Sequence, residues 1–278
     1  MRFPIGKKAN PMEFNTFYGF TATPFTRNVP ADKLYSTEEF QESLGRLRYA
    51  SEHQLFALVT GDCGTGKTTL IRKLASILDD KKYRLLYLSD SKLTPRNFYH
   101  GLLDQLGCES HFYRGDAMRQ LHRQTSLLLG MQGLHLVVTV DESHLLSKAM
   151  LEEIRFLLNV KMDSESPLAL ILVGQSELWE RLSLQAYTAV RQRIDIRCRV
   201  PHLSRDQTAR YIASSLENVK CTAGIFSDSA ISAIYQYSAG TVRLINKVCT
   251  QCLFYGAQKH QRILDDHIVS RVVKGDLS

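Results

Sequence analysis

The sequence has no apolar run long enough to cross a bilayer. Its longest apolar stretches, at 134–140 and 168–173, fall far short of the ~18 to 20 residues that a membrane span needs. Basic residues near the N-terminus are not followed by an apolar stretch of ~7 to 15 residues, so no secretion signal is predicted. We therefore expect a cytoplasmic protein with no membrane partner.

Cysteine is scarce, with six residues at irregular positions among 278. This favours reduced thiols over a disulfide framework. Cys249 and Cys252 form a C-x-x-C pair inside a helical pattern, but no second cysteine or histidine pair lies nearby, so a metal site is not predicted there. Low-complexity segments and internal repeats are also absent, and the 44% hydrophobic content excludes a disordered chain.

Acidic residues are fewer than basic ones. The chain has 35 lysines and arginines against 28 aspartates and glutamates, which gives a formal net charge of +7. Such an excess suits a polyanionic partner, either nucleic acid or an acidic membrane surface. The net charge does not choose between them, so the choice depends on motifs.

Short apolar runs alternate with helical patterns through the middle of the chain. The runs at 55–60, 85–88, 134–140 and 168–173 precede segments of helical spacing at 70–78, 95–106, 148–159 and 176–184. Strands that are apolar throughout and alternate with helices indicate a parallel sheet covered on both faces. The predicted fold class is therefore α/β.

The two ends of the chain differ from this middle part. Residues 1–50 are predicted to form an N-terminal arm and a helix at 37–49. From Pro201 onward the periodicity is only helical, with Ser204 and Gln207 spaced as a capping box and Ser227 placed as an N-cap. The predicted domains are 1–50, an α/β domain at 51–200, and an all-helical domain at 201–278.

Residues 61–68, GDCGTGKT, match the phosphate-loop pattern G-x-x-x-x-G-K-[ST] between a strand and a helix. The glycines let backbone N–H groups curl around a phosphate at the positive end of the helix. Lys67 is expected to reach the β- and γ-phosphates, and the Thr68 hydroxyl to hold Mg²⁺. The predicted nucleotide-binding residues of this loop are Gly61, Asp62, Cys63, Gly64, Thr65, Gly66, Lys67, Thr68 and Thr69.

The apolar strand at 134–140 is followed by two carboxylates. Asp141 is expected to bind the magnesium ion through water, and Glu142 to orient and polarise the attacking water. A solvated acidic turn is the alternative for a single motif, but the phosphate loop upstream favours hydrolysis. The absence of N-K-x-D favours ATP over GTP, so the expected cofactors are ATP and Mg²⁺.

Three further polar side chains are candidates to detect or stabilise the transferred phosphate. Gln175, after the strand at 168–173, either positions the water or is an ordinary turn residue. Arg193, favoured over Arg191, is the candidate arginine finger that enters a neighbouring subunit's site. Arg243 lies at the start of a helix. It either senses whether ATP or ADP is bound or is an ordinary surface arginine.

Together these motifs resemble those of the AAA+ ATPases, with 61–68 as Walker A, 137–142 as Walker B, Gln175 near sensor 1, Arg193 near the finger and Arg243 as sensor 2. The resemblance implies an AAA+ P-loop domain followed by a small helical lid domain. More narrowly, the sequence is similar to the ExeA/GspA family in FYGF (17–20), VDESHLL (140–146), LILVGQSEL (170–178) and G-x-x-R-x-I-N (240–246).

That family includes general-secretion ATPases and short proteins similar to the MuB and TnsC transposition regulators. The secretion members carry a membrane segment and a peptidoglycan-binding extension after the ATPase, and neither occurs before Ser278, so we expect a transposition regulator. The family's usual prolines are replaced by Ser176 and Val242. Both replacements soften the backbone constraint without removing a reactive group.

The likeness to MuB and TnsC implies rings or helical filaments on duplex DNA. It places sequence-independent phosphate contacts after the second strand, at Lys92, Thr94 and Arg96, with Arg114, Arg119 and Arg123 further on. A solvated helix face is the alternative for these residues. The expected function is an ATPase that oligomerises on duplex DNA and recruits or regulates a transposase. The alternatives are a general-secretion-type assembly ATPase with a protein or envelope partner, and a nucleotide switch with negligible turnover.

Overall fold

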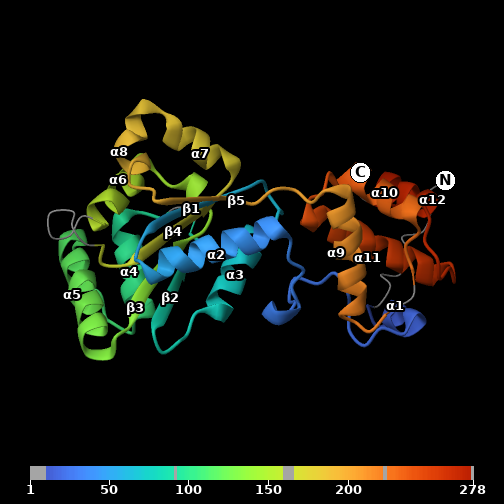
Figure 1. Ribbon diagram of the computed structural model, residues 1–278, viewed down its shortest axis with the longest axis horizontal. Coiled ribbons are helices and arrows are strands. Elements are labelled where there is room, and N and C mark those ends of the chain that lie inside the picture. The colour runs from blue at the N-terminus through green and yellow to red at the C-terminus, as the bar shows by residue number, and fades with distance from the viewer. Residues whose placement is uncertain (1–10, 91–92, 159–165, 222–223, 277–278) are drawn as a thin grey trace. The chain divides into compact units, whose positions relative to one another are not determined.

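The computed structural model describes residues 11–90, 93–158, 166–221 and 224–276 (Figure 1). Contacts within the chain divide it into two compact units. The α/β unit is Glu38–Pro201, and the helical unit combines Met1–Thr37 with His202–Ser278. The segment expected as an N-terminal arm and its following helix therefore belong to different units.

Within the described ranges, no helix combines the length and the apolar character that crossing a membrane requires.

The α/β unit contains five parallel strands in the order β2-β3-β4-β1-β5. The strands are β1 (Phe56–Thr60), β2 (Tyr83–Leu88), β3 (His135–Val140), β4 (Ala169–Gly174) and β5 (Ile196–Arg199). Every residue of β1 and β4 is buried, as expected for a parallel sheet covered on both faces. Because the strands are parallel, the carboxyl ends of β1, β3 and β4 lie at the same edge of the sheet.

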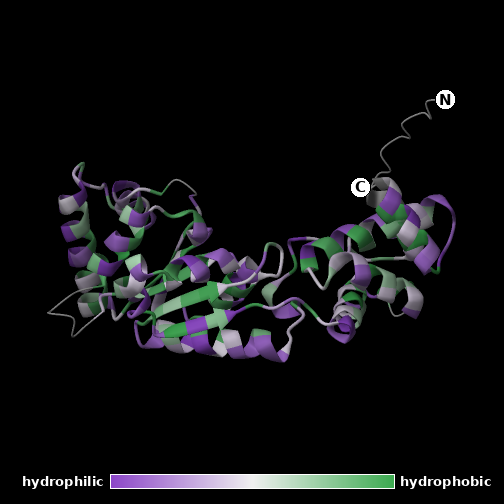
Figure 2. Cartoon of the chain, turned by 90° about the horizontal axis from the view of Figure 1, so that it is seen from above, coloured by the Kyte–Doolittle hydropathy of each residue, from purple (hydrophilic) through white to green (hydrophobic). Residues whose placement is uncertain are grey.

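Helices cover both faces of this sheet. One face packs against α2 (Glu38–Glu52) and α3 (Lys67–Ile77), and the other against α4 (Pro95–Gln105), α5 (Arg114–Gln132), α6 (Lys148–Leu157), α7 (Ser176–Ser183) and α8 (Thr188–Arg191). Alternate residues of β1 enter the two cores, with Leu58 in one and Val59 in the other. Strands β1, β3 and β4 are accordingly almost entirely buried and largely hydrophobic, and the sheet of this unit is mostly green in Figure 2. The predicted α/β fold is confirmed.

The described elements of the helical unit are α1 (Pro11–Tyr18), α9 (Arg205–Glu217), α10 (Asp228–Ser238), α11 (Val242–Gln258) and α12 (Asp266–Asp276), with a short 3-10 turn at Ala31–Lys33. The expected capping box is present, since Ser204 Oγ accepts from the N–H of Gln207 and the Gln207 side chain accepts from the N–H of Ser204. Ser227 caps α10 by accepting from the N–H of Ala230.

Aromatic and thiol side chains pack together with aliphatic ones in the core of the helical unit. Phe14 of α1 packs edge-on against Phe254, with 4.7 Å between ring centroids. Cys249 and Cys252 are fully buried on α11, and burial raises the pKa of both thiols, that of Cys252 to about 12. They are therefore protonated core residues, and the part of the chain that the structure covers contains no cluster of histidine, cysteine and carboxylate groups suited to a metal.

A buried carboxylate connects three helices on one side of the sheet. Glu153 of α6, with only 5% of its side chain exposed, accepts from the Tyr99 hydroxyl of α4 at 2.6 Å. It also accepts from Nε of Arg114 at the start of α5, at 2.8 Å. Since a buried charge needs both hydrogen bonds and an opposite charge, these donors are what allow Glu153 to be buried there.

Arg114→Ala should therefore destabilise the α/β unit by about 1 to 3 kcal/mol. The expected loss is smaller than for a fully buried ion pair, because the arginine side chain is 48% exposed. Urea denaturation followed by circular dichroism measures this. Arg119→Ala on the same helix is the control, because its exposed pair with Asp116 should contribute less than about 1 kcal/mol. Equal losses for the two variants would contradict the structural role of Arg114.

Candidate active site

The phosphate loop joins the end of β1 to the start of α3, and three of its glycines are required by its geometry. Gly64 and Gly66 have φ angles of 83° and 108°, which residues other than glycine rarely adopt. A Cβ on Gly61 would lie 2.5 Å from the carbonyl oxygen of Val200. The loop is braced internally by Thr65, whose hydroxyl donates to the Asp62 carbonyl at 2.9 Å.

Lys67 lies across this loop. Its Nζ donates to the carbonyl oxygens of Gly61 and Asp62, both at 2.9 Å. Partial burial lowers the pKa of the lysine, while the nearby Glu142 and Asp141 carboxylates act in the opposite direction. The ammonium group is thus fixed beside the N-terminus of α3, which is a combination of charges suited to bind phosphate. Thr68 and Thr69 follow in the first turn of α3, and Cys63 is exposed on the loop.

Asp141, directly after β3, accepts three hydrogen bonds at the site. It is 4% exposed, and its Oδ2 accepts from the Thr68 hydroxyl at 2.9 Å and from the Tyr87 hydroxyl of β2 at 2.7 Å. Its Oδ1 accepts from the backbone N–H of Glu142 at 2.8 Å. Burial and the bond to Asp141 raise the pKa of Tyr87, which therefore remains a donor. Sequence reasoning missed Tyr87, because nothing local distinguishes it from a packed strand residue.

The oxygens of Thr68 and Asp141 fit a magnesium ion. Mg²⁺ prefers hard oxygen ligands and is usually held by one or two protein groups together with substrate phosphates. A hydroxyl and a carboxylate 2.9 Å apart, beside a phosphate loop, form such a set. The ion would neutralise charge on the β- and γ-phosphate oxygens.

Glu142 and Gln175 are brought together by a residue that sequence reasoning did not single out. Glu142 has φ 52° and a side chain that is 51% exposed. His144 lies between the two candidates, with Nδ1 3.6 Å from Glu142 Oε2 and Nε2 3.0 Å from Gln175 Nε2. The available signal was the position of His144 inside the VDESHLL motif.

A different contact joins the residue after Gln175 to the phosphate loop. The Ser176 hydroxyl donates to Asp62 Oδ1 at 2.7 Å. Ser176 stands where the resembling family usually has proline, so this chain gains a side-chain donor at that position. Both residues that follow β4, Gln175 and Ser176, therefore contact parts of the site.

The two candidate finger arginines lie in and after α8. Nη1 of Arg193 lies 3.5 Å from the Arg155 carbonyl oxygen, and Nη1 of Arg191 donates to the Ser183 carbonyl at 2.8 Å. Arg197 of β5 stacks over Trp179 at 3.8 Å, in keeping with a structural edge of the sheet.

Arg243 belongs to the helical unit, where it is exposed in the first turn of α11. The turn before it requires glycine, because Gly240 has φ 75° and a Cβ there would lie 1.9 Å from the Leu203 carbonyl oxygen. The G-x-x-R pattern thus has a backbone reason for its first residue.

The DNA candidates have unequal surroundings. Thr94 caps α4 by accepting from the Asn97 N–H at 3.2 Å, and Arg96 is exposed with its guanidinium 4.0 Å from the Phe112 ring centroid. Lys92 lies outside the described residues. Arg114 is engaged by Glu153 and Arg119 by Asp116, while Arg123 is exposed.

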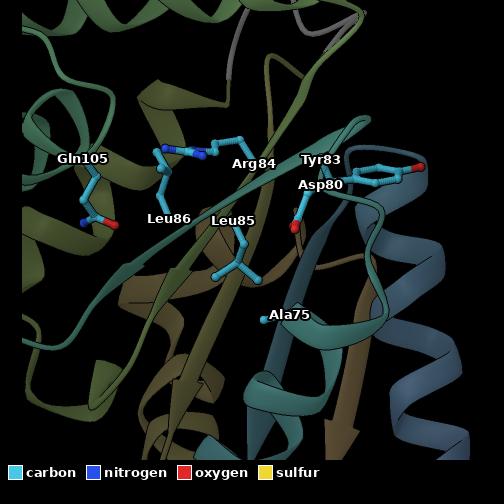
Figure 3. A pocket seen from close by; sticks show the side chains of 7 residues that line it. All are labelled: Ala75, Asp80, Tyr83, Arg84, Leu85, Leu86 and Gln105. Atoms are coloured by element: carbon cyan, nitrogen blue, oxygen red, sulfur yellow. The ribbon is translucent and has the colours of Figure 1, made fainter. Parts of the chain in front are cut away.

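A cavity of about 320 Å³ lies beside the edge strand β2 (Figure 3). Its lining includes Arg84, Leu85 and Gln105. The Gln105 side chain bonds to both the N–H and the carbonyl of Tyr87, each at 3.0 Å. None of the candidate catalytic, nucleotide-binding or metal-binding residues lines this cavity.

Two sequence comparisons bear on the identity of the chain. A family model described as an AAA domain matches residues 49–182. General secretion pathway protein A of Aeromonas hydrophila is 29% identical over 273 residues, which is 95% of this chain and 47% of that protein. The chain thus spans about half the length of this curated relative.

Solved structures share the fold at low sequence identity. The Cdc6p structure from Pyrobaculum aerophilum has a TM-score of 0.68 and 16% identity, covering 86% of this chain and 67% of that one. Drosophila ORC bound to DNA has a TM-score of 0.68 and 17% identity, covering 100% and 70%. The RuvB Holliday junction branch migration motor of Thermotoga maritima has a TM-score of 0.60 and 19% identity, covering 90% and 72%. Residues 49–182 thus match an AAA domain, the chain shares its fold with these solved structures, and nearly all of it is similar to part of general secretion pathway protein A.

Proposed function

We propose that this chain binds ATP with Mg²⁺, hydrolyses it, and uses the cycle to assemble or remodel a protein partner. The observation that supports this best is the buried Asp141 carboxylate bonded to Thr68 at the phosphate loop, with Glu142 next in the chain. Lys67 and the backbone N–H groups of the loop bind the phosphates, while Thr68 and Asp141 hold the metal ion.

In this proposal Glu142 is the general base. Its side chain is half exposed, so it can accept a proton from a water molecule placed in line with the γ-phosphate. Gln175 orients the same water or the phosphate, and Arg193 of a neighbouring subunit stabilises the charge that develops in the transition state. Arg243 couples the bound nucleotide to the helical unit. Active sites completed by a neighbour require an oligomer.

The choice of partner follows the curated relative, whose name is that of a secretion protein. This favours a general-secretion-type assembly ATPase over the transposition regulator expected from the sequence. A DNA-bound regulator that recruits a transposase remains the second candidate, because Arg96 is exposed at the start of α4 and the net charge is +7.

Lys67→Ala should abolish ATP binding, because it removes the cation that meets the phosphates. Glu142→Gln should keep ATP bound and lower turnover by about 10² to 10⁴-fold, because it removes only the base. Titration with a fluorescent ATP analogue and a phosphate-release assay measure the two effects. A Glu142→Gln variant with parental turnover would contradict the assignment.

Arg193→Ala should bind ATP normally but lose about 10³-fold or more of its turnover. Mixing it with Lys67→Ala subunits, which are themselves inactive, should restore phosphate release, because the second variant still supplies the arginine. The matched control replaces Arg191 instead. If mixing with Lys67→Ala subunits restored phosphate release to Arg191→Ala but not to Arg193→Ala, the arginine finger would be Arg191.

Duplex DNA should leave the ATPase rate unchanged if the partner is a protein. The test compares phosphate release with and without DNA at two salt concentrations, using the parent, Arg96→Ala and the control Arg48→Ala, which changes an exposed arginine of α2 that is not a DNA candidate. Salt-sensitive stimulation that Arg96→Ala alone removes would overturn the protein-partner proposal in favour of the DNA-bound regulator.

A further inference from the structure

We propose that His144 is a positioning residue that orients the carboxylate of Glu142 and connects it to Gln175. The inference rests on the proposed ATP hydrolysis and adds a part that the Walker motifs do not contain. His144 lies in the 3-10 turn Ser143–Leu145, immediately after the two carboxylates. Its side chain is 8% exposed, so the ring is held by protein rather than by bulk water.

The contacts of the ring determine which nitrogen carries the proton. Gln175 Nε2 lies 3.0 Å from His144 Nε2, and an amide nitrogen can only donate. His144 Nε2 is therefore the acceptor, and the proton of the neutral ring is on Nδ1. Nδ1 is buried, has no hydrogen-bond partner and lies 3.6 Å from Glu142 Oε2.

The opposite orientation of the Gln175 amide is less favourable. Its oxygen would then accept from Nε2–H, and the lone pair of Nδ1 would face the Glu142 carboxylate. Two acceptors at 3.6 Å repel each other, whereas Nδ1–H and a carboxylate attract. The orientation of the Gln175 amide and that of the Glu142 carboxylate are therefore coupled, because both groups face nitrogens of the same His144 ring.

The backbone around His144 is anchored, so the ring has a defined position. Nη1 of Arg181 in α7 lies 3.3 Å from the His144 carbonyl oxygen and donates to the Leu146 carbonyl at 2.6 Å. The Ser143 hydroxyl donates to the Val140 carbonyl at 2.7 Å. Glu142 is half exposed, and a small rotation about its side-chain bonds would close the 3.6 Å separation into a hydrogen bond. His144 then selects one orientation of the base.

The test uses two substitutions of different chemistry. His144→Leu removes both nitrogens and should lower kcat about 10- to 100-fold, with the ATP dissociation constant unchanged, because the base is misplaced while the phosphate loop is intact. His144→Asn retains an amide at the place of Nδ1 and should recover part of kcat. His53→Leu, a substitution on the α2 side of the unit, is the control and should keep the parental rate.

Double variants separate positioning from loss of structure. His144→Leu should have no further effect on turnover when Glu142 is already Gln, because there is no base left to orient. Combined with Gln175→Ala, it should cost less than the sum of the two single changes, since both act through one contact chain. Additive losses, or equal falls in ATP affinity and kcat for both His144 variants, would overturn the role of His144.

The two proposals fail in different ways. If the parent binds ATP but releases no phosphate, the proposed ATPase function is wrong. If the parent is active and His144→Leu matches it, or exceeds it, the proposed function stands and the positioning role is wrong.

Discussion

The site depends on one buried negative charge. Asp141 is accommodated only because three donors from different elements converge on its carboxylate: Thr68 of α3, Tyr87 of β2 and the N–H of Glu142. Satisfying this charge therefore fixes the start of α3 relative to the ends of β2 and β3. The phosphate loop, which precedes α3 directly, takes its position from the same arrangement.

The end of β4 is connected to the site in two ways. Ser176 bonds to Asp62 in the phosphate loop, and Gln175 reaches Glu142 through His144. One link contacts the segment that would hold the phosphates and the other contacts the proposed base. A displacement at the end of β4 would thus change both nucleotide binding and hydrolysis.

Local patterns explain which parts of this structure the sequence could predict. The strand, loop and helix around 55–78, and the caps at Ser204 and Ser227, are encoded within a few residues, so their positions agree with expectation. Tyr87 was missed because its partner Asp141 lies 54 residues further along the chain, and the role of His144 was missed because its contact with Gln175 joins residues 31 positions apart. Arg114 shows the same effect, since only packing reveals that it neutralises Glu153. The aromatic N-terminal segment likewise packs into the core of the helical unit, where Phe14 contacts Phe254.

The edge of the sheet carries a further consequence. Strand β2 has β3 on one side only, and the amide of Gln105 occupies both the N–H and the carbonyl of Tyr87 on the other side. A glutamine side chain there imitates one peptide unit of a missing neighbour. Open edges can pair with the strands of other molecules, and this one is occupied near its carboxyl end. This contact thereby hinders another strand from pairing with β2 at Tyr87.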